Sequence, residues 1–316
     1  MEKIAVVILN WNQSQLTIEC LDSVFKSELP ANFQAVVIVV DNNSSVKEKE
    51  ILTNYLEKAG RQLQANFRCQ LIENQKNFGF AGGDNIGIKS AIRQSCDYLF
   101  LLNNDTEIKN DCLKNLLREL KKNKNIGVVS PKIYYARGYE YHLNRYQPKE
   151  LGHVIWFAGG KIDWHNLLGA HIGVDKVDKG QYDQIKTIDF ATGCAFLTKK
   201  EVFERVGVFD ERFFLYLEDL DFSLRIRKNN FKIKFIPQAV VYHKNAASSG
   251  SGSVLHDYYF TRNRLLFAQK HASIKLKLLL YKQALSYFFG QDKIRKQAVK
   301  DYLLQKFGYK NTTSIE

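Results

Sequence analysis

The sequence contains little cysteine and no arrangement that would pair it. Its five cysteines are an odd number, and no two of them are spaced as C-x-x-C. We therefore expect neither a disulfide framework nor a zinc site, which is typical of a protein in a reducing compartment.

Segments that would carry the chain across a membrane are also missing. The N-terminus opens directly into a strand pattern, without the basic region and cleavage site of a secretory signal. The longest apolar stretch near the C-terminus, Leu276 to Phe289, is interrupted by Lys277 and Lys282 and is too short to span a bilayer. We therefore expect a cytoplasmic protein, either soluble or attached peripherally to the inner face of the cell membrane.

What the chain does contain is a large apolar fraction and an uneven positive charge. Of its 316 residues 45% are hydrophobic and 13% are aromatic, which suits one large folded domain with an appendage. The net charge is +13, and residues 255–310 hold twelve Lys or Arg against three Asp. A solvated helical face, an anionic membrane surface and nucleic acid are the alternatives. Interleaved aliphatic and aromatic residues favour the membrane over nucleic acid, although a homodimer contact would use the same helices.

Three near-continuous apolar runs each end in Asn and Asp. They are Ile4–Leu9, Ala35–Val40 and Tyr98–Leu102, followed by Asn10-Trp11-Asn12, Asp41-Asn42-Asn43-Ser44 and Asn103-Asn104-Asp105. Such runs suit parallel strands covered on both faces, and helices are expected between them at about 15–26, 47–59, 84–94 and 111–122. One such polar end alone could mark a turn. The three together predict a ligand site at the carboxyl edge of an open parallel sheet.

The alternation of strands and helices breaks after Tyr135. Strands of a mixed extension are expected at 154–164, 188–199 and 232–242, with one short helix at 219–228. From residue 255 the pattern is helical, with breaks near Ala272 and Gly290. We therefore predict an α/β domain over residues 1–254, divided near residue 135, and a basic helical segment over 255–316.

A glycine-rich stretch, residues 77–87, follows a strand and opens a helix. Glycines there let a ligand approach the backbone, and the helix N-terminus favours anions. The stretch is not a P-loop, because Ile88 stands where the lysine should be, and it lacks the G-x-G-x-x-G of dinucleotide sites. A tight strand-to-helix turn explains it equally well.

Three carboxylates stand among hydrophobic residues in the segment 214–221. Asp221 can pair with Arg225 at i,i+4, so a structural role suffices for it. Glu218 and Asp219 could cap the helix N-terminus, but adjacent acids beside aromatic residues favour a catalytic base at Asp219. His243 ends a strand before a run of Gly and Ser, where it is either structural or a metal ligand.

These elements, in this order, resemble the inverting glycosyltransferases of family 2, and within that family the bacterial rhamnosyltransferases that build surface polysaccharides. The resemblance runs from Ile4 to about Phe267. It depends on the three strand ends, the glycine stretch and several later segments, which are Ala191-Thr192-Gly193, Glu218-Asp219-Leu220-Asp221, Tyr242-His243, Tyr258-Tyr259 and Arg262-Asn263. It implies the GT-A fold, Rossmann-like and mostly parallel, with a nucleotide-binding half and an acceptor-side half.

The resemblance also implies a role for each matching residue. Asp41 would read the pyrimidine base of a dTDP- or UDP-sugar. The other expected nucleotide-sugar contacts are Asn10, Asn12, Asn77, Gly79, Gly82, Gly83, Asn103 and Asn104. Asn103 replaces the first Asp of the family's Asp-x-Asp motif, which leaves Asp105 as the carboxylate ligand of Mg²⁺ or Mn²⁺, and His243 would complete that metal site.

On the acceptor side, the resemblance makes Asp219 the base that deprotonates the attacking hydroxyl. Glu218, Thr192 and Gly193 would hold the acceptor, a growing glycan that we expect to be lipid-linked. The implied donor is dTDP-L-rhamnose. A second donor such as UDP-galactofuranose or a UDP-hexose, a non-catalytic glycan- or membrane-binding protein, and a basic nucleic-acid-binding protein are the alternatives.

Overall fold

The computed structural model describes residues 1–61, 63–245 and 253–311. A ten-stranded sheet forms its centre, in the order β10-β12-β6-β11-β4-β1-β2-β3, with β5 added beside β12 and β7 beside β6. The strands of this sheet are β1 (Glu2–Asn10), β2 (Phe33–Asp41), β3 (Phe67–Glu73), β4 (Tyr98–Asn103), β5 (Thr106–Ile108), β6 (Ile126–Tyr135), β7 (Ile155–Phe157), β10 (Lys186–Thr187), β11 (Ala195–Lys199) and β12 (Lys232–His243).

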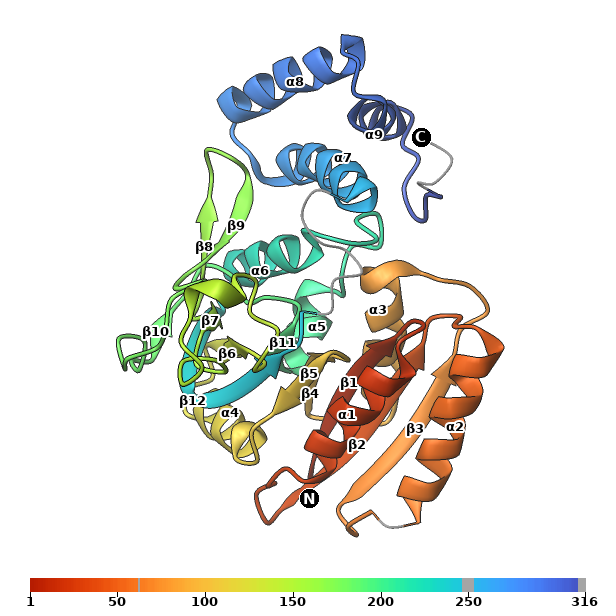
Figure 1. The fold of residues 1–316 in the computed structure, drawn as a ribbon, viewed down its shortest axis with the longest axis vertical. Coiled ribbons are helices and arrows are strands. Elements are labelled where there is room, and N and C mark those ends of the chain that lie inside the picture. Colours follow the sequence, from red (N-terminus) through yellow and green to blue (C-terminus); the bar gives the residue numbers. More distant parts are fainter. Residues whose placement is uncertain (62, 246–252, 312–316) are drawn as a thin grey trace.

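Helices cover the sheet and extend beyond it (Figure 1). They are α1 (Ser14–Phe25), α2 (Val46–Gly60), α3 (Gly79–Arg93), α4 (Cys112–Lys121), α5 (Lys200–Val206), α6 (Glu218–Lys228), α7 (Val254–His271), α8 (Ile274–Phe289) and α9 (Lys293–Leu303), with a 3₁₀ turn, η1, at Leu143–Arg145. The predicted α/β class with C-terminal helices is confirmed, including breaks at Ala272 and Gly290. Within the described residues no helix is both long and apolar enough to traverse a bilayer.

The parallel half of the sheet follows the predicted β-α-β alternation. Strands β1, β2, β3 and β4 are mutually parallel along the order β4-β1-β2-β3. The chain crosses the sheet in one direction from β1 to β3 and then returns to place β4 on the other side of β1. Because each connection is right-handed, α1 and α2 lie on one face of the sheet and α3 lies on the other (Figure 1). The residues from Ile4 to Ile8 are fully buried, as expected for a strand covered on both faces.

The second half of the sheet is mixed, as predicted. The strand predicted at 232–242 forms as β12, but the other two are shorter than expected. Of the strand predicted at 188–199 only β11 forms, antiparallel to β4 and β6. The strand predicted at 154–164 is split into β7 and β8 (Gly160–Asp163), and β8 pairs with β9 (Leu168–His171) in a separate hairpin. Gly159 has a φ of +113° at the split, a conformation that L side chains rarely adopt, so the strand breaks there.

The glycine stretch also differs from its prediction. The helix expected from Asp84 begins five residues earlier, at Gly79, so Gly82 and Gly83 lie in the first turns of α3 and not in a loop. A Cβ at Gly83 would stand 2.4 Å from Cδ1 of Leu9 on β1, and one at Gly79 would stand 2.4 Å from the carbonyl oxygen of Phe214. Close packing of α3 on the sheet and on the loop before α6 therefore requires these glycines.

Candidate active site

The predicted nucleotide residues meet at the carboxyl edge of the parallel strands. Asn10 and Asp41 are register partners at the ends of β1 and β2, and Asn10 Nδ2 donates to Asp41 Oδ1 at 2.8 Å. Asp41 Oδ2 accepts from the backbone N–H of Ser44 at 2.9 Å, which fixes the carboxylate. Both side chains are fully buried, so the edge is already ordered in the protein alone.

A second set of amides links this edge to the start of α3. Asn42 Nδ2 donates to Asn77 Oδ1 at 2.9 Å and to the carbonyl oxygen of Gly79 at 3.0 Å. Asn42 Oδ1 accepts from the backbone N–H of Phe78. Asn12 Oδ1 accepts from the backbone N–H of Ser45 at 2.8 Å. The end of β2 thereby positions the strand-to-helix turn at residues 77–79.

The segment after β4 faces the same edge. Asn104 Nδ2 donates to Thr17 Oγ1 at 3.0 Å, and Thr17 Oγ1 donates to Asn10 Oδ1 at 2.8 Å. Asn104 is thereby brought to the Asn10–Asp41 pair through a residue of α1. The backbone N–H of Asn103 donates to the carbonyl oxygen of Cys194 at 2.8 Å. This bond connects the segment to the loop at residues 191–194, here named the acceptor-side loop after its predicted role.

Asp105 and His243, the predicted metal ligands, face each other. Asp105 Oδ1 lies 3.2 Å from His243 Nε2, and both side chains are largely buried. His243 Nδ1 is buried without a hydrogen-bond partner among the described residues, and its ring contacts Trp156 edge-on at 4.5 Å. Across residues 1–61, 63–245 and 253–311 no cluster of three or more His, Cys, Asp or Glu forms a larger metal cage.

This pair fits a Mg²⁺ or Mn²⁺ ion that a substrate diphosphate would help to hold. Such ions use one or two protein ligands together with substrate phosphates more often than a cage built entirely of protein. The carboxylate oxygen of Asp105 and the imidazole nitrogen of His243, 3.2 Å apart and largely buried, offer two donors to such an ion.

Asp219 lies at the first turn of α6 and contacts the acceptor-side loop. Its Oδ2 accepts from the backbone N–H of Gly193 at 2.9 Å, and its Oδ1 accepts from that of Leu220 at 2.7 Å. Burial raises the pKa of Asp219, while the bond from Gly193 opposes part of that rise. The carbonyl oxygen of the next residue, Cys194, accepts from the backbone N–H of Asn103, so adjacent residues contact Asp219 and the segment that carries Asp105.

Glu218, the residue before Asp219, is only 5% exposed, and its Oε2 has no hydrogen-bond partner in the described part of the chain. Burial first, and then the adjacent charge of Asp219, raise its pKa well above the usual range. A protonated Glu218 would present an O–H donor next to the carboxylate of Asp219. The side chain of Thr192 bonds within its own loop, to the backbone N–H of Cys194, and not to either acid.

The segment before α6 is backbone-strained. Phe214, Tyr216 and Leu217 all have positive φ, between +63° and +72°, which is uncommon for bulky residues. Asn263 on α7 compensates: its Nδ2 lies 2.8, 2.7 and 2.8 Å from the carbonyl oxygens of residues 213, 215 and 216. The fully buried Arg262 adds bonds to the carbonyl oxygens of residues 212 and 213.

The predicted Asp221–Arg225 pair is confirmed, at 2.8 Å, and it belongs to a larger network. Lys270 Nζ and His271 Nε2 of α7 lie 2.6 and 2.7 Å from Asp221 Oδ1. Sequence reasoning did not assign roles to these α7 residues, nor to Asn42 and Thr17. Asn42 carried a signal as part of a polar strand end, whereas Thr17 looked like an ordinary helix residue.

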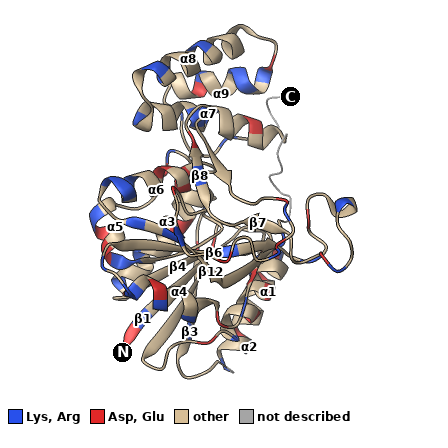
Figure 2. Ribbon diagram, turned by 90° about the vertical axis from the view of Figure 1, so that its left-hand side faces the viewer, with Lys and Arg blue, Asp and Glu red and all other residues tan. Residues whose placement is uncertain are grey.

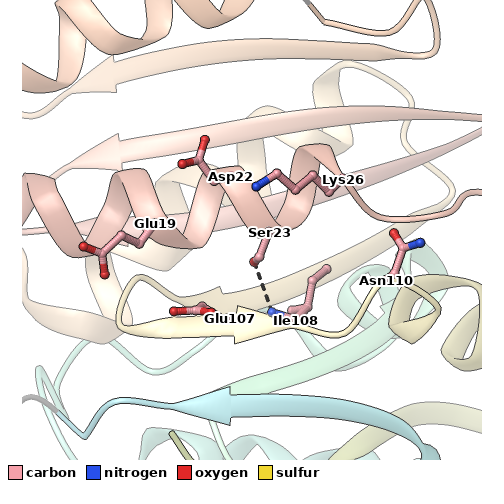
Figure 3. A pocket seen from close by; sticks show the side chains of 7 residues that line it. All are labelled: Glu19, Asp22, Ser23, Lys26, Glu107, Ile108 and Asn110. Carbon is pink, nitrogen blue, oxygen red and sulfur yellow. Dashed lines mark hydrogen bonds between the residues drawn. The ribbon is translucent and has the colours of Figure 1, made fainter. Parts of the chain in front are cut away.

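A surface hollow of about 610 Å³ lies beside this region, between α1 and β5 (Figure 3). Its lining residues are Glu19, Asp22, Ser23, Lys26, Glu107, Ile108 and Asn110. None of them is a predicted site residue, and its carboxylates Glu19 and Glu107 are both paired with Lys244. We therefore place the site at the strand ends and not in this hollow.

Asp84, in the second turn of α3, is a buried carboxylic acid whose ionisation should weaken the fold. It is 3% exposed, and burial raises its pKa to about 8. Because the folded pKa lies above the unfolded one, its stability contribution is complete at low pH and falls as pH rises towards about 8. The free energy of unfolding of the wild-type protein should therefore fall by roughly 1.4 kcal/mol per pH unit between about pH 4 and pH 8. Asp84→Asn should remove this fall.

Urea unfolding at several pH values would measure this effect. The unfolding free energies of wild type and Asp84→Asn should diverge as the pH rises, whereas the exposed control Glu57→Gln should run parallel to wild type. Parallel curves for Asp84→Asn would show that Asp84 is not a protonated acid in the folded protein.

Comparison with known proteins identifies the family. Residues 5–207 match the family model described as Glycosyl transferase family 2. The match ends before Asp219, so the role of that residue depends on its geometry and on the motif around it.

Three curated relatives are similar to this chain. The low-salt glycan biosynthesis hexosyltransferase Agl10 of Haloferax volcanii is 26% identical over 60% of this chain and 56% of its own length. The dTDP-rhamnosyl transferase RfbF of Shigella flexneri is 24% identical over 85% and 80%. The N-acetylglucosaminyl-diphospho-decaprenol L-rhamnosyltransferase of Mycobacterium tuberculosis is 31% identical over 56% of each. The chain thus spans little more than half the length of the first and third.

Solved glycosyltransferases share the fold. GalNAc-T7, in a structure with UDP, GalNAc and Mn²⁺, superposes with a TM-score of 0.66 over 95% of this chain and 55% of its own, at 18% identity. The mannosyltransferase PcManGT of Pyrobaculum calidifontis, in complex with GDP-Man and Mn²⁺, gives 0.54 over 96% and 74%, at 15% identity. The GT-A fold expected from the sequence is confirmed, and the chain belongs to glycosyl transferase family 2.

Proposed function

We propose that this protein is an inverting glycosyltransferase that moves L-rhamnose from dTDP-L-rhamnose to a growing, lipid-linked or surface-polysaccharide glycan. One observation carries the catalytic part of the proposal. Asp219 and the Asp105–His243 pair occupy the same edge of the sheet, joined through the contacts of Gly193 and Cys194. The names of the Shigella and Mycobacterium relatives support rhamnose as the sugar.

The nucleotide would lie along the strand ends. Asp41, held by Asn10 and Ser44, would accept a hydrogen bond from the imide N–H of a thymine or uracil, and its buried carboxylate would have to become accessible when the nucleotide binds. Asn12, Asn77 and the N-terminus of α3, with Gly79, Gly82 and Gly83, would border the ribose, the diphosphate and the sugar. Asn103 and Asn104 would lie between this group and Asp105.

Asp219 would act as the general base. Its carboxylate takes the proton of an acceptor hydroxyl as the hydroxyl oxygen forms a bond to the anomeric carbon of the sugar. The bond from that carbon to the diphosphate breaks with its electron pair, so the nucleoside diphosphate leaves and the anomeric configuration inverts. Glu218, Thr192 and Gly193 would hold the acceptor beside Asp219.

Asp105 and His243 would hold the divalent ion against the diphosphate. When bound, Mg²⁺ or Mn²⁺ supplies Lewis-acid stabilisation of the charge that develops on the leaving group. The Mn²⁺ in the GalNAc-T7 and PcManGT structures supports a divalent ion here. The two side chains would thereby orient the diphosphate as the leaving group.

A donor panel tests the proposed function. Purified protein with Mg²⁺ or Mn²⁺ would be given dTDP-L-rhamnose, UDP-galactofuranose and UDP-hexoses, with release of nucleoside diphosphate as the readout. We expect release from dTDP-L-rhamnose. Preference for a UDP-sugar would replace the donor but keep the reaction class, whereas no turnover together with no calorimetric binding of dTDP or UDP would refute a transferase.

The strained segment before Asp219 gives a prediction about positioning. Asn263→Ala removes the amide that bonds three carbonyl oxygens of residues 213–216, so the first turn of α6 should lose its fixed orientation. We expect kcat to fall by roughly one to two orders of magnitude, as for misplacement of a catalytic group. The dTDP affinity should change little, because Asp41 and Asn10 lie on other elements. An equal loss of dTDP affinity would indicate general unfolding instead.

A further inference from the structure

The outer face of α8 is apolar and uncovered. Ile274, Leu278, Leu285 and Phe289 are 57–78% exposed, and their spacing places them on one stripe of the helix. The opposite face carries Leu280 and Ala284, which are buried in the core shared with the neighbouring helices. The helix is therefore apolar on both sides, although only one side is packed.

Positive charge borders this stripe. Lys275, Lys277 and Lys282 lie on α8, and the helix has no Asp or Glu between Ile274 and Phe289. No ion pair to these three lysines exists within the described part of the chain, so their charges are available to a partner. Figure 2 shows the lysines of α8 and, beside them, the Lys and Arg residues of α9.

The position of α8 relates the stripe to the candidate active site. The strands β1 and β2 run away from the N-terminus towards the helical end of the molecule, and α8 is the outermost helix at that end (Figure 1). The carboxyl ends of β1 and β2, with Asn10 and Asp41, thus face the same end of the molecule as α8.

We propose that the outer face of α8 docks the protein onto an anionic lipid bilayer, with the four apolar side chains entering the interface and the lysines contacting headgroups. Apolar side chains flanked by lysines are the composition of a helix that lies in a membrane interface. A second copy of this chain fits less well, because it would bring six lysines of two α8 helices together without a carboxylate on either helix. This inference does not depend on catalysis.

Flotation of the full chain with lipid vesicles tests the proposal. Vesicles of phosphatidylcholine with phosphatidylglycerol, at low salt, should carry the wild-type protein, and vesicles of phosphatidylcholine alone should carry much less. The double variant L278S/F289S should bind about ten-fold more weakly or worse, because two interfacial side chains are removed. The matched control V46S/Y141S changes two exposed apolar residues elsewhere and should bind like wild type.

Three results would overturn the docking surface. Wild-type protein that stays off anionic vesicles would exclude it. Equal binding of L278S/F289S would place the membrane contact on another surface. A wild-type dimer that L278S/F289S converts to monomer, without vesicle binding, would make a second copy the occupant. Circular dichroism of L278S/F289S should match wild type, since both side chains are exposed; if it does not, K275Q/K282Q provides the same test through the charges.

Discussion

Asp219→Asn is expected to lower kcat by about a thousand-fold, because the substitution keeps the shape of the side chain but removes its ability to accept a proton. The contacts of Asp219 indicate that the substitution should affect catalysis and not the local structure. The Asn Oδ1 can still accept from one of the backbone N–H groups of Gly193 and Leu220, so the loop and the first turn of α6 should stay in place. Steady-state release of nucleoside diphosphate measures kcat, and calorimetric binding of dTDP shows whether the nucleotide site is intact.

The control for this variant is Glu57→Gln, the same change of a carboxylate to an amide on the exposed face of α2. It should retain wild-type kcat. The wild-type pH profile adds a second check: because burial raises the pKa of Asp219, activity should disappear as the pH falls through a value above the usual range of Asp. An Asp219→Asn variant with near-normal kcat would assign the base to another residue.

Asp105→Asn should have the second large effect, on binding of the nucleotide. It removes the carboxylate that faces His243 at 3.2 Å and leaves an amide, a far weaker ligand for a divalent ion. We expect the Kd for dTDP in the presence of Mn²⁺ to rise by about two orders of magnitude, or about 3 kcal/mol. Calorimetry with and without the metal would measure this.

The metal-free arm makes the second prediction specific. With a chelator present, wild type and Asp105→Asn should bind dTDP equally weakly, because the contacts of Asp41 and Asn10 remain. His243→Gln should weaken the Mn²⁺-dependent binding less than Asp105→Asn does, since an uncharged ligand contributes less. Manganese-dependent affinity that survives in Asp105→Asn would remove this pair from the metal site.

Local patterns in the sequence predicted the parallel half of the sheet. The runs before Asn10, Asp41 and Asn103 were long, apolar and separated by helices, so the residues that end each strand could be assigned to one edge. The hydrogen bonds that join Asn10 to Asp41 directly, and to Asn104 through Thr17, agree with that assignment. These features could be predicted because they depend only on the order of residues along the chain and on the geometry of a parallel sheet.

Where the prediction was inaccurate, contacts between distant segments decided the structure. The helix α3 starts at Gly79 because its first turns pack against Leu9 and Phe214, and no local signal reveals such packing. The strand expected from residue 188 forms only from residue 195. The network of Asp221 with Lys270 and His271 likewise joins residues about fifty positions apart.

The segment 213–217 shows the same limit at the site itself. Its positive φ values at Phe214, Tyr216 and Leu217 contradict local preference, and the bonds from Asn263 and Arg262 to its carbonyl oxygens help to hold them. The sequence resemblance included Arg262 and Asn263 but gave them no role. Because they hold this strained segment, we propose that they position the base Asp219.

The anomeric configuration of the product tests the central claim most directly. The donor that the panel identifies would be reacted with a saccharide acceptor, and proton NMR would compare the new glycosidic bond with the sugar–phosphate bond of the donor. A single displacement assisted by Asp219 predicts inversion in every turnover. Retention of configuration would require a second carboxylate acting as nucleophile, and it would contradict the mechanism proposed for this site.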